Sequence, residues 1–338
     1  MRSLSILLLL LLQSLALCQE KGNQQETTVH VPFVCTAGET HTYQVTETKY
    51  KKDKVDSVKT QILTLKILSV DDQKIVATMK LAAQLDEATL KKLESDPVTK
   101  AFKELWDSLD FEVVITPNGV FSEFRNMEEI EAAVAKTREM IVGIVEEMKP
   151  ALLQRRAEKL GKDPAELDPA ELDRVFAMVM KQQGSTQAAM ARILAPLNLI
   201  LYFVDTKHEI GKPSVEQIQF DLGAASGLPA TETYRVKEVM RKSNQAVIRF
   251  QRRIEGQEAA AKYQKALDAM VQQMDPNHKP STSVPKVTVL SDTLMEGRMD
   301  LDSGWPQTVS WITKMNNMKD DQLEIKSKFE VQRVEPKK

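Results

Sequence analysis

The chain has 338 residues and a formal net charge of −2, with 46 lysines and arginines against 48 aspartates and glutamates. The two signs are scattered without a basic stripe, which argues against a nucleic-acid-binding protein. This length can bury a sizeable core in one large domain or two ordinary ones.

Residues 1–18 have the pattern of a secretory signal peptide. Arg2 supplies a positive start, residues 6–12 are all aliphatic, and residues 16–18 (Ala-Leu-Cys) precede a cleavage point at Gln19. The apolar run is shorter than the roughly 20 residues that cross a bilayer. We therefore expect an exported protein that is extracellular, periplasmic or envelope-associated. The mature chain contains no second long apolar segment, so we expect no transmembrane segment in it.

Cys18 allows a second interpretation, in which it is the acylated first residue of a bacterial lipoprotein. That signal usually has a small residue before the cysteine, and here the residue is Leu17. Acylation would anchor the protein to a membrane. If the segment is cleaved after Cys18, only the unpaired Cys35 remains, so no disulfide can form within the chain.

The mature chain is expected to begin with a polar tether over residues 19–37 and to continue as an antiparallel meander. Residues 41–50 (HTYQVTETKY) alternate apolar and polar side chains, which predicts a strand. Residues 61–85 predict two more strands joined at Asp71 and Asp72. Residues 117–119 (Pro-Asn-Gly) predict the tight turn of a further hairpin.

From Asn126 the apolar period changes from two to 3.6, which predicts a helical block over about residues 127–204. Asn126 and Glu129 have the spacing of a capping box. The tandem repeat at residues 163–172 (DPAELDPAEL) contains two helix starts, each with a cap, a proline and a glutamate.

The remaining chain returns to strands, interrupted by one helix over about residues 257–274 that ends at Asp275-Pro276. Because the early and late strands share one alternating pattern, we expect them to join. The predicted fold class is α+β, with a large curved antiparallel β-sheet and an inserted helical block packed on its apolar face. Residues 38–335 would form this single domain.

Trp305 and Trp311 share sequence parity with the aliphatic residues of the same C-terminal hairpin. Both indoles are therefore expected on the core-facing side of the sheet. The alternative is that they contact an apolar ligand.

Methionines are frequent in the helical block, and methionine suits both irregular cores and adaptable apolar surfaces. An ordinary helical core explains them. A pocket for an acyl chain between sheet and helices is the alternative, with Met127, Ile141 and Met148 as candidate contacts in addition to the tryptophans.

No pattern predicts catalytic, cofactor-binding or metal-binding residues, and we expect no cofactor. The four histidines are scattered, and the chain contains no HExxH, CxxC, GxSxG, P-loop or GxGxxG motif. Asp300 and Asp302 resemble a fragment of a calcium loop, but the other ligands of an EF-hand are absent. A solvated sheet edge explains this pair better.

Four segments resemble families of exported bacterial proteins, several of them lipoproteins, that are domains of unknown function. The segments are AGETHTYQVTET, VVITPNGVFSEF, HEIGKPSVEQIQFDL with ETYRVKEVMRKSNQAVIRF, and GRMDLDSGWPQTVSWITKM. Each is short, and the resemblance implies no functional residues. More distantly, the expected architecture is similar to that of periplasmic lipoprotein carriers that hold acyl chains, a likeness of architecture alone.

These observations favour a non-enzymatic exported protein that binds a lipid, another amphipathic ligand or an unknown protein partner between sheet and helices. A structural or scaffold protein of the envelope is the first alternative. A hydrolase with catalytic residues dispersed in the sequence is the second, and it requires a cleft in which a nucleophile or acid meets a second such group.

Overall fold

The computed structural model describes residues 27–84, 104–105, 107–161, 163, 173, 176–177, 185–223, 225–274, 279–280, 286–317 and 321–335. The expected signal peptide, the candidate lipidation site Cys18 and most of the repeat at residues 163–172 lie outside these residues.

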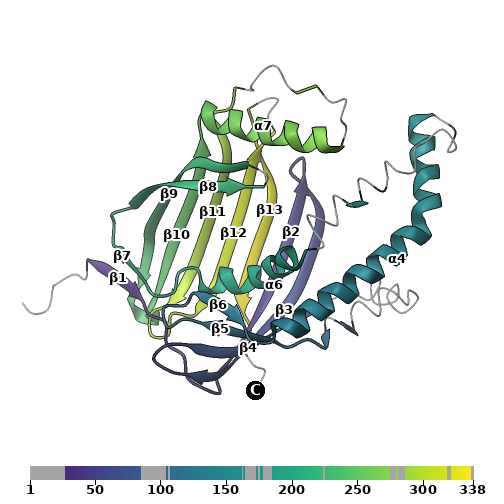
Figure 1. Cartoon of the computed structure of the whole chain (residues 1–338). Coiled ribbons are helices and arrows are strands. Elements are labelled where there is room, and N and C mark those ends of the chain that lie inside the picture. The colour runs from purple at the N-terminus through teal and green to yellow at the C-terminus, as the bar shows by residue number, and fades with distance from the viewer. Residues whose placement is uncertain are drawn as a thin grey trace, which may run out of the picture.

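Most of the described chain forms one antiparallel sheet of 11 strands. In spatial order the strands are β6 (Phe121–Phe124), β5 (Phe111–Ile115), β4 (Ile75–Gln84), β3 (Lys54–Val70), β2 (Thr40–Lys51), β13 (Leu323–Arg333), β12 (Pro306–Asn316), β11 (Val289–Asp300), β10 (Gln245–Glu255), β9 (Ala225–Met240) and β8 (Ser214–Leu222). Figure 1 shows that the sheet is curved, with β4, β5 and β6 turned across one end of the central strands.

The sheet is continuous because the N-terminal strand group joins the C-terminal one through β2 and β13. Val45 lies opposite Val331 in this pairing, so apolar residues from the two ends of the chain meet on one face. The prediction of a single antiparallel sheet within an α+β fold is confirmed. The predicted turns at Asp71-Asp72 and at residues 117–119 also connect the strands they were assigned to, β3 with β4 and β5 with β6.

Three helices are described: α4 (Met127–Leu160), α6 (Thr186–Leu201) and α7 (Gln257–Met274). α6 lies across one face of the sheet, and α7 packs at the far end of the sheet on β9 and β10. α4 starts at the sheet edge and projects away from the sheet (Figure 1). No helix in the described ranges is both long and apolar enough to cross a membrane.

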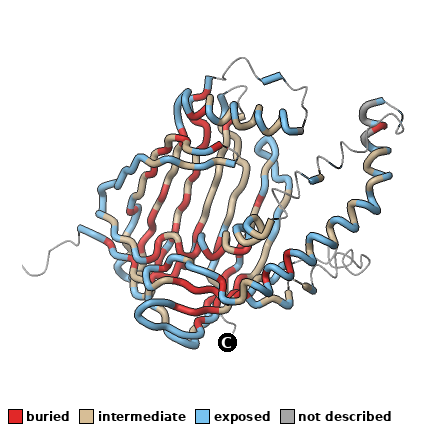
Figure 2. Tube along the Cα trace, in the orientation of Figure 1, coloured by how far each residue is buried: buried red, intermediate tan, exposed pale blue. Residues whose placement is uncertain are grey.

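We call the face that carries α6 the inner face. Its core contains buried residues from both strand groups and from α6, and α6 contributes Ile193, Leu197, Ile200 and Leu201. Alternation along β2 directs Tyr43 and Val45 toward this face, as the sequence pattern predicts. Figure 2 shows that the buried residues gather where α6 and the turned strands meet the central sheet.

The start of α4 differs from the expected capping box. The side chain of Asn126 caps no backbone amide of the helix. Its Oδ1 instead accepts a hydrogen bond from the Glu112 amide at 3.0 Å, and its Nδ2 donates to the Asp110 carbonyl at 2.7 Å. The Asn126 side chain therefore links the start of α4 to β5, because backbone groups at β5 take the hydrogen bonds that a capping box would use.

The expected tether over residues 19–37 is corrected in its second half. Residues 28–31 form β1 (Thr28–Val31), which pairs with β7 (Thr206–Glu209), and Val29 and Val31 are buried. The chain then crosses the turn at Gly304, whose φ is +76° and where a Cβ would overlap the Pro32 carbonyl oxygen. Residues 28–32 are therefore packed against the rest of the domain and are not a free tether.

Candidate functional site

The inner face is divided into two parts by α6. On β2 and β3 the residues beneath α6 are apolar and buried, including Tyr43, Leu63 and Leu65. Further along the same strands the inner-face positions become polar, with Glu47 on β2 and Lys59 on β3. We call these parts the covered half and the open half.

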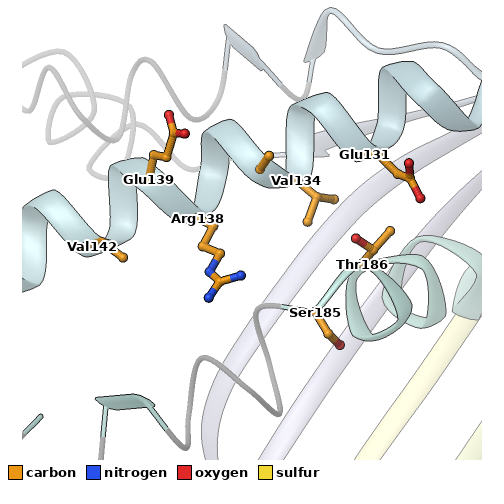
Figure 3. A pocket seen from close by; sticks show the side chains of 8 residues that line it. Glu131, Val134, Arg138, Glu139, Val142, Ser185 and Thr186 are labelled. Carbon is orange, nitrogen blue, oxygen red and sulfur yellow. The ribbon is translucent and has the colours of Figure 1, made fainter.

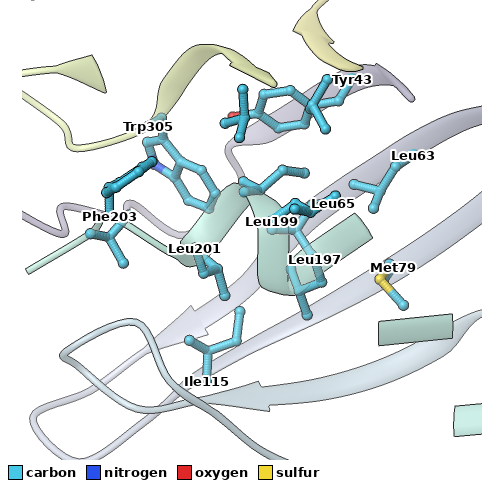
Figure 4. Close-up of a cluster of buried hydrophobic side chains, with 14 of the residues drawn as sticks. Tyr43, Leu63, Leu65, Met79, Ile115, Leu197, Leu199, Leu201, Phe203 and Trp305 are labelled. Carbon is cyan, nitrogen blue, oxygen red and sulfur yellow. The ribbon is translucent and has the colours of Figure 1, made fainter. Parts of the chain in front are cut away.

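Trp305 belongs to the covered half. It is 1% exposed, its ring stacks on His41 with a 4.0 Å centroid separation, and Phe33 packs at 5.3 Å. Its Nε1 donates a hydrogen bond to the Val34 carbonyl at 3.1 Å. Figure 4 shows this indole among Leu199, Leu201 and Phe203. Trp305 is therefore a core residue, and it offers no surface to a ligand.

His41 gives this core a titratable group. Its pKa is lowered by burial and by the Arg333 guanidinium, which donates to Nδ1 at 3.3 Å, while Glu39 opposes the shift. Tyr43 is fully buried, and burial raises its pKa. Burial likewise raises the pKa of the Cys35 thiol to about 12, with a further contribution from Glu39, so this thiol is a poor nucleophile.

Trp311 belongs to the open half. It lies opposite Phe329 on β13 and Met295 on β11, and it is half-buried. Its Nε1 donates to the Thr313 hydroxyl at 2.9 Å, so one edge of the indole is fixed while part of the ring stays accessible. In Figure 2 the sections of β12 and β13 beyond α6 are intermediate in burial. The two tryptophans thus have different environments despite their common parity.

A groove of about 490 Å³ runs beside α6 along the open half. This volume is within the range of about 300–1,000 Å³ that is usual for small-molecule sites. Its apolar lining comes from Val45, Ala195, Pro196 and Phe329. Its polar lining consists of Glu47, Lys49, Lys59, Gln61 and Arg192.

An ion pair extends the open half toward β8. Arg252 donates through Nε to Glu232 at 2.7 Å, and the side chains are only 16% and 10% exposed. The guanidinium lies 4.0 Å from the centroid of the Phe220 ring. Pairing and ring contact compensate the cost of removing these charges from water.

Two tyrosines connect this ion pair to α6. The Tyr202 hydroxyl lies 3.3 Å from the Tyr234 hydroxyl, and Tyr234 donates to Glu232 at 3.5 Å. Burial is the largest cause of the raised pKa of both tyrosines. These hydroxyls are therefore neutral hydrogen-bonding groups that hold the end of α6 on the sheet.

The three candidate contacts on α4 are not brought together with the tryptophans. Met127 packs against the core at the base of the helix, whereas Ile141 is half-buried and Met148 is 47% exposed. The reason is that α4 leaves the sheet after its first turns, so the apolar stripe along its length does not continue onto the sheet (Figure 1).

A second pocket, of about 550 Å³, lies between α4 and the first turn of α6. Glu131, Arg138 and Glu139 line it together with the hydroxyls of Ser185 and Thr186. Figure 3 shows Arg138 directed toward Ser185, and Glu139 directed away from it. Val134, Ala135 and Val142 complete a lining of mixed polarity that opens to solvent, so this pocket differs from the enclosed apolar space expected beneath the helical block.

Asp300 and Asp302 stabilise the β11–β12 turn. Asp300 Oδ1 accepts from the backbone amides of Asp302 and Ser303 at 2.9 Å each, and Asp302 accepts from Asn244 at 2.6 Å. Within the described part of the chain, no cluster of three or more histidine, cysteine or acidic side chains is placed to hold a metal ion.

No sequence pattern predicted a site at the groove residues Lys49, Lys59, Arg192 and Phe329. A usable signal was present, because Glu47 and Lys49 continue the period of two set by Tyr43 and Val45. Where charged side chains replace apolar ones on the core-facing side of a strand, they indicate that the helix covering the sheet has ended. Arg192 offered no comparable signal, because its position depends on how α6 crosses the strands.

No protein-family model matches the chain, and no curated protein matches it.

Proposed function

We propose that this is an exported, non-enzymatic binding protein that holds an amphipathic ligand on the open half of its inner face. One observation carries the proposal: beside α6 the inner face forms a groove of about 490 Å³ in which apolar side chains of β2, β13 and α6 lie next to charged side chains. Phe329 lines the groove next to charged side chains, and the half-buried Trp311 lies opposite Phe329 on the neighbouring strand. An apolar floor with a few polar groups at its rim is the usual composition of a ligand site.

The covered half supports this location for the ligand. Beneath α6 the side chains of Leu65, Met79, Ile115 and Leu197 meet in one buried cluster (Figure 4). A ligand in that position would have to displace packed core, whereas the groove beside α6 already exists. In this proposal the helical block expected over about residues 127–204 covers the inner face through α6, which borders the ligand, whereas α4 projects away from the sheet.

Binding is tested by titrating the mature protein with dodecanoate and measuring heat and tryptophan emission. We expect saturable binding and a change in tryptophan emission. Trp311 lies opposite Phe329, which lines the groove, whereas Trp305 is buried. Trp311→Phe should remove most of the emission change but retain the heat of binding. A titration without saturable heat would contradict the proposal.

The matched variants are Phe329→Ala and Ile312→Ala. Phe329 lines the groove, whereas Ile312 lies one residue along β12 from Trp311 and points to the opposite face. Loss of a large apolar contact should weaken binding by about 5- to 30-fold in Phe329→Ala, equivalent to about 1–2 kcal/mol. Ile312→Ala should bind like the wild type. Equal losses would show that the groove is not the site.

Export and membership of an exported bacterial family are part of the same proposal. They are supported by the composition of residues 1–18 and by the four resembling segments. Mass spectrometry of the secreted protein should give a mature chain that begins at Gln19. If Cys18 is acylated instead, Cys18→Ser will change the gel mobility and release the protein from membranes. A product that retains residues 1–18 and stays in the cytoplasm would contradict export.

A further inference from the structure

We propose that the ligand of the open half carries an acidic head group, held by Lys49 and Lys59 at one end of the groove. This inference rests on the proposed function and specifies its ligand as a single-chain amphiphile with a carboxylate or phosphate head. Among the described residues, two lysines and one carboxylate, Glu47, line this part of the groove, although the whole chain has a net charge of −2. The strand residues of the groove are thus locally positive on a slightly acidic protein.

The two lysines lie on neighbouring strands. Lys49 is on β2 and Lys59 is on β3, and Arg192 on α6 also lines the groove. Glu47 lies 3.5 Å from the Lys49 ammonium and opposite Lys59 in the strand pairing. One carboxylate between two lysines leaves a positive excess, which favours an anion.

Polarity changes in the same direction on neighbouring strands. Along β2 the inner-face order is Tyr43, Val45, Glu47, Lys49, and along β3 the order is Leu65, Leu63, Gln61, Lys59. On β13 the order runs from the buried Val331 to the half-buried Phe329 and then to Ser327. Because these three strands are neighbours, the residues form bands that run from apolar to charged across the sheet.

The bands orient the ligand. Its apolar chain would lie on Val45, Pro196 and Phe329, adjacent to the covered half, and its head would lie at Lys49 and Lys59. The reverse orientation would place an anion against Val45 and the core, where desolvation is costly. The two lysines are exposed, so each contact with the head group is weakened by water and salt, and we expect selectivity rather than very tight binding.

The test compares three probes of equal chain length with different heads: dodecanoate, dodecyl phosphate and 1-dodecanol. Calorimetry at low salt should show both acids bound about 5- to 10-fold more tightly than the alcohol, as expected for several weak charge contacts. The preference should decrease at 0.5 M salt. A larger gain for the phosphate than for the carboxylate would identify the phosphate as the preferred head.

The decisive variants are Lys49→Gln with Lys59→Gln, compared with Lys66→Gln and Lys314→Gln. The control lysines lie on β3 and β12 but face away from the groove, so both pairs remove the same charge. The groove pair should abolish the preference for acids and leave binding of the alcohol unchanged. The control pair should retain the preference.

The outcomes separate this inference from the proposed function. Equal affinity of the wild type for dodecanoate and dodecanol would overturn the acidic-head proposal, while binding on the open half would stand. Equal loss of acid binding in both lysine pairs would also overturn it, because net charge and not position would then decide. Failure of all three probes to bind would remove the proposed function itself.

Discussion

The covered and open halves of the inner face are built from the same strands and differ in what lies above them. On β12, Val309 is 2% exposed beneath α6, and Trp311, two residues further along, is half-buried beside it. On β13, Val331 and Phe329 show the same change. Alternation along a strand therefore determines the face on which a side chain lies. It does not determine whether that part of the face is buried or exposed to solvent.

This difference assigns separate physical roles to two identical residue types. Trp305 contributes its large apolar area and its Nε1 hydrogen bond to folding, whereas Trp311 leaves part of its ring available. If the division is correct, substitutions in the covered half will act mainly on stability, and substitutions in the open half will act mainly on binding.

The largest effect is expected for Trp305→Ala. Removing a fully buried indole should lower the free energy of unfolding by about 3–5 kcal/mol, because transfer energy and a cavity both contribute. Trp311→Ala, its matched control, should cost only about 1 kcal/mol, because its ring is half-buried. Urea unfolding measures both. Similar losses in the two variants would break the comparison between the halves.

Gly297→Ala is expected to have the next largest effect. Gly297 on β11 lies beneath Phe203, and a Cβ there would approach the ring to 2.6 Å. The added methyl group must shift a buried aromatic side chain, which should cost about 1–3 kcal/mol of unfolding free energy. Thermal unfolding measures the change in stability, and adding Phe203→Leu to the variant should restore part of the lost stability. Lack of any destabilisation would mean that the covered half is less tightly packed than its burial indicates.

His41 should make the covered half sensitive to pH. Its pKa is lowered by burial and by Arg333, so the unfolded chain takes up a proton on His41 at higher pH than the folded protein does. Stability is therefore complete above the unfolded-state pKa of about 6.5 and is lost as the pH falls below it.

His41→Phe retains a ring against Trp305 but cannot titrate, so it should lose less stability than the wild type between pH 7 and pH 5. Urea unfolding at pH 8, where His41 is neutral in both states, provides the reference for each protein. Burial also lowers the pKa of His208, which should leave a residual slope in the variant. If the free energy of unfolding of the wild type and of the variant changed equally with pH, His41 would be excluded as the source of the pH dependence.

The smallest effect on stability is expected for Lys59→Gln. Lys59 is exposed in the open half, so its replacement should change the free energy of unfolding by no more than about 0.5 kcal/mol. Leu63→Ala on the same strand and face, but in the covered half, should cost about 2–5 kcal/mol. A large loss for Lys59→Gln would mean that the lysine supports the fold, and that binding data on it must be corrected for unfolding.

Much of the fold could be predicted from local patterns. The period of two in β2, β3 and β4, the Pro-Asn-Gly turn and the 257–274 helix each depend on neighbouring residues alone, and each is present in the structure. The capping box at Asn126 was wrong because a strand amide, 14 positions earlier in the chain, takes its side-chain oxygen. Local spacing cannot register a competitor that folding brings near.

The candidate site was predicted only in part. Parity placed Trp305 and Trp311 on one face but could not separate a core residue from a half-exposed one. Ile141 and Met148 match the apolar stripe of a helix, yet α4 carries them away from the sheet. Lys49 and Lys59 have the same parity as the core residues of their strands. Whether such a position is buried or open to solvent depends on where α6 stops covering the sheet.

The sequence by itself determined most of the strands and helices, and the face on which most strand side chains lie, because backbone geometry imposes periods of two and 3.6 on any chain. Only the tertiary structure decided which part of the inner face is dry. That choice depends on the path of α6 over strands that join from both ends of the chain, and on the contacts that hold α6 in place.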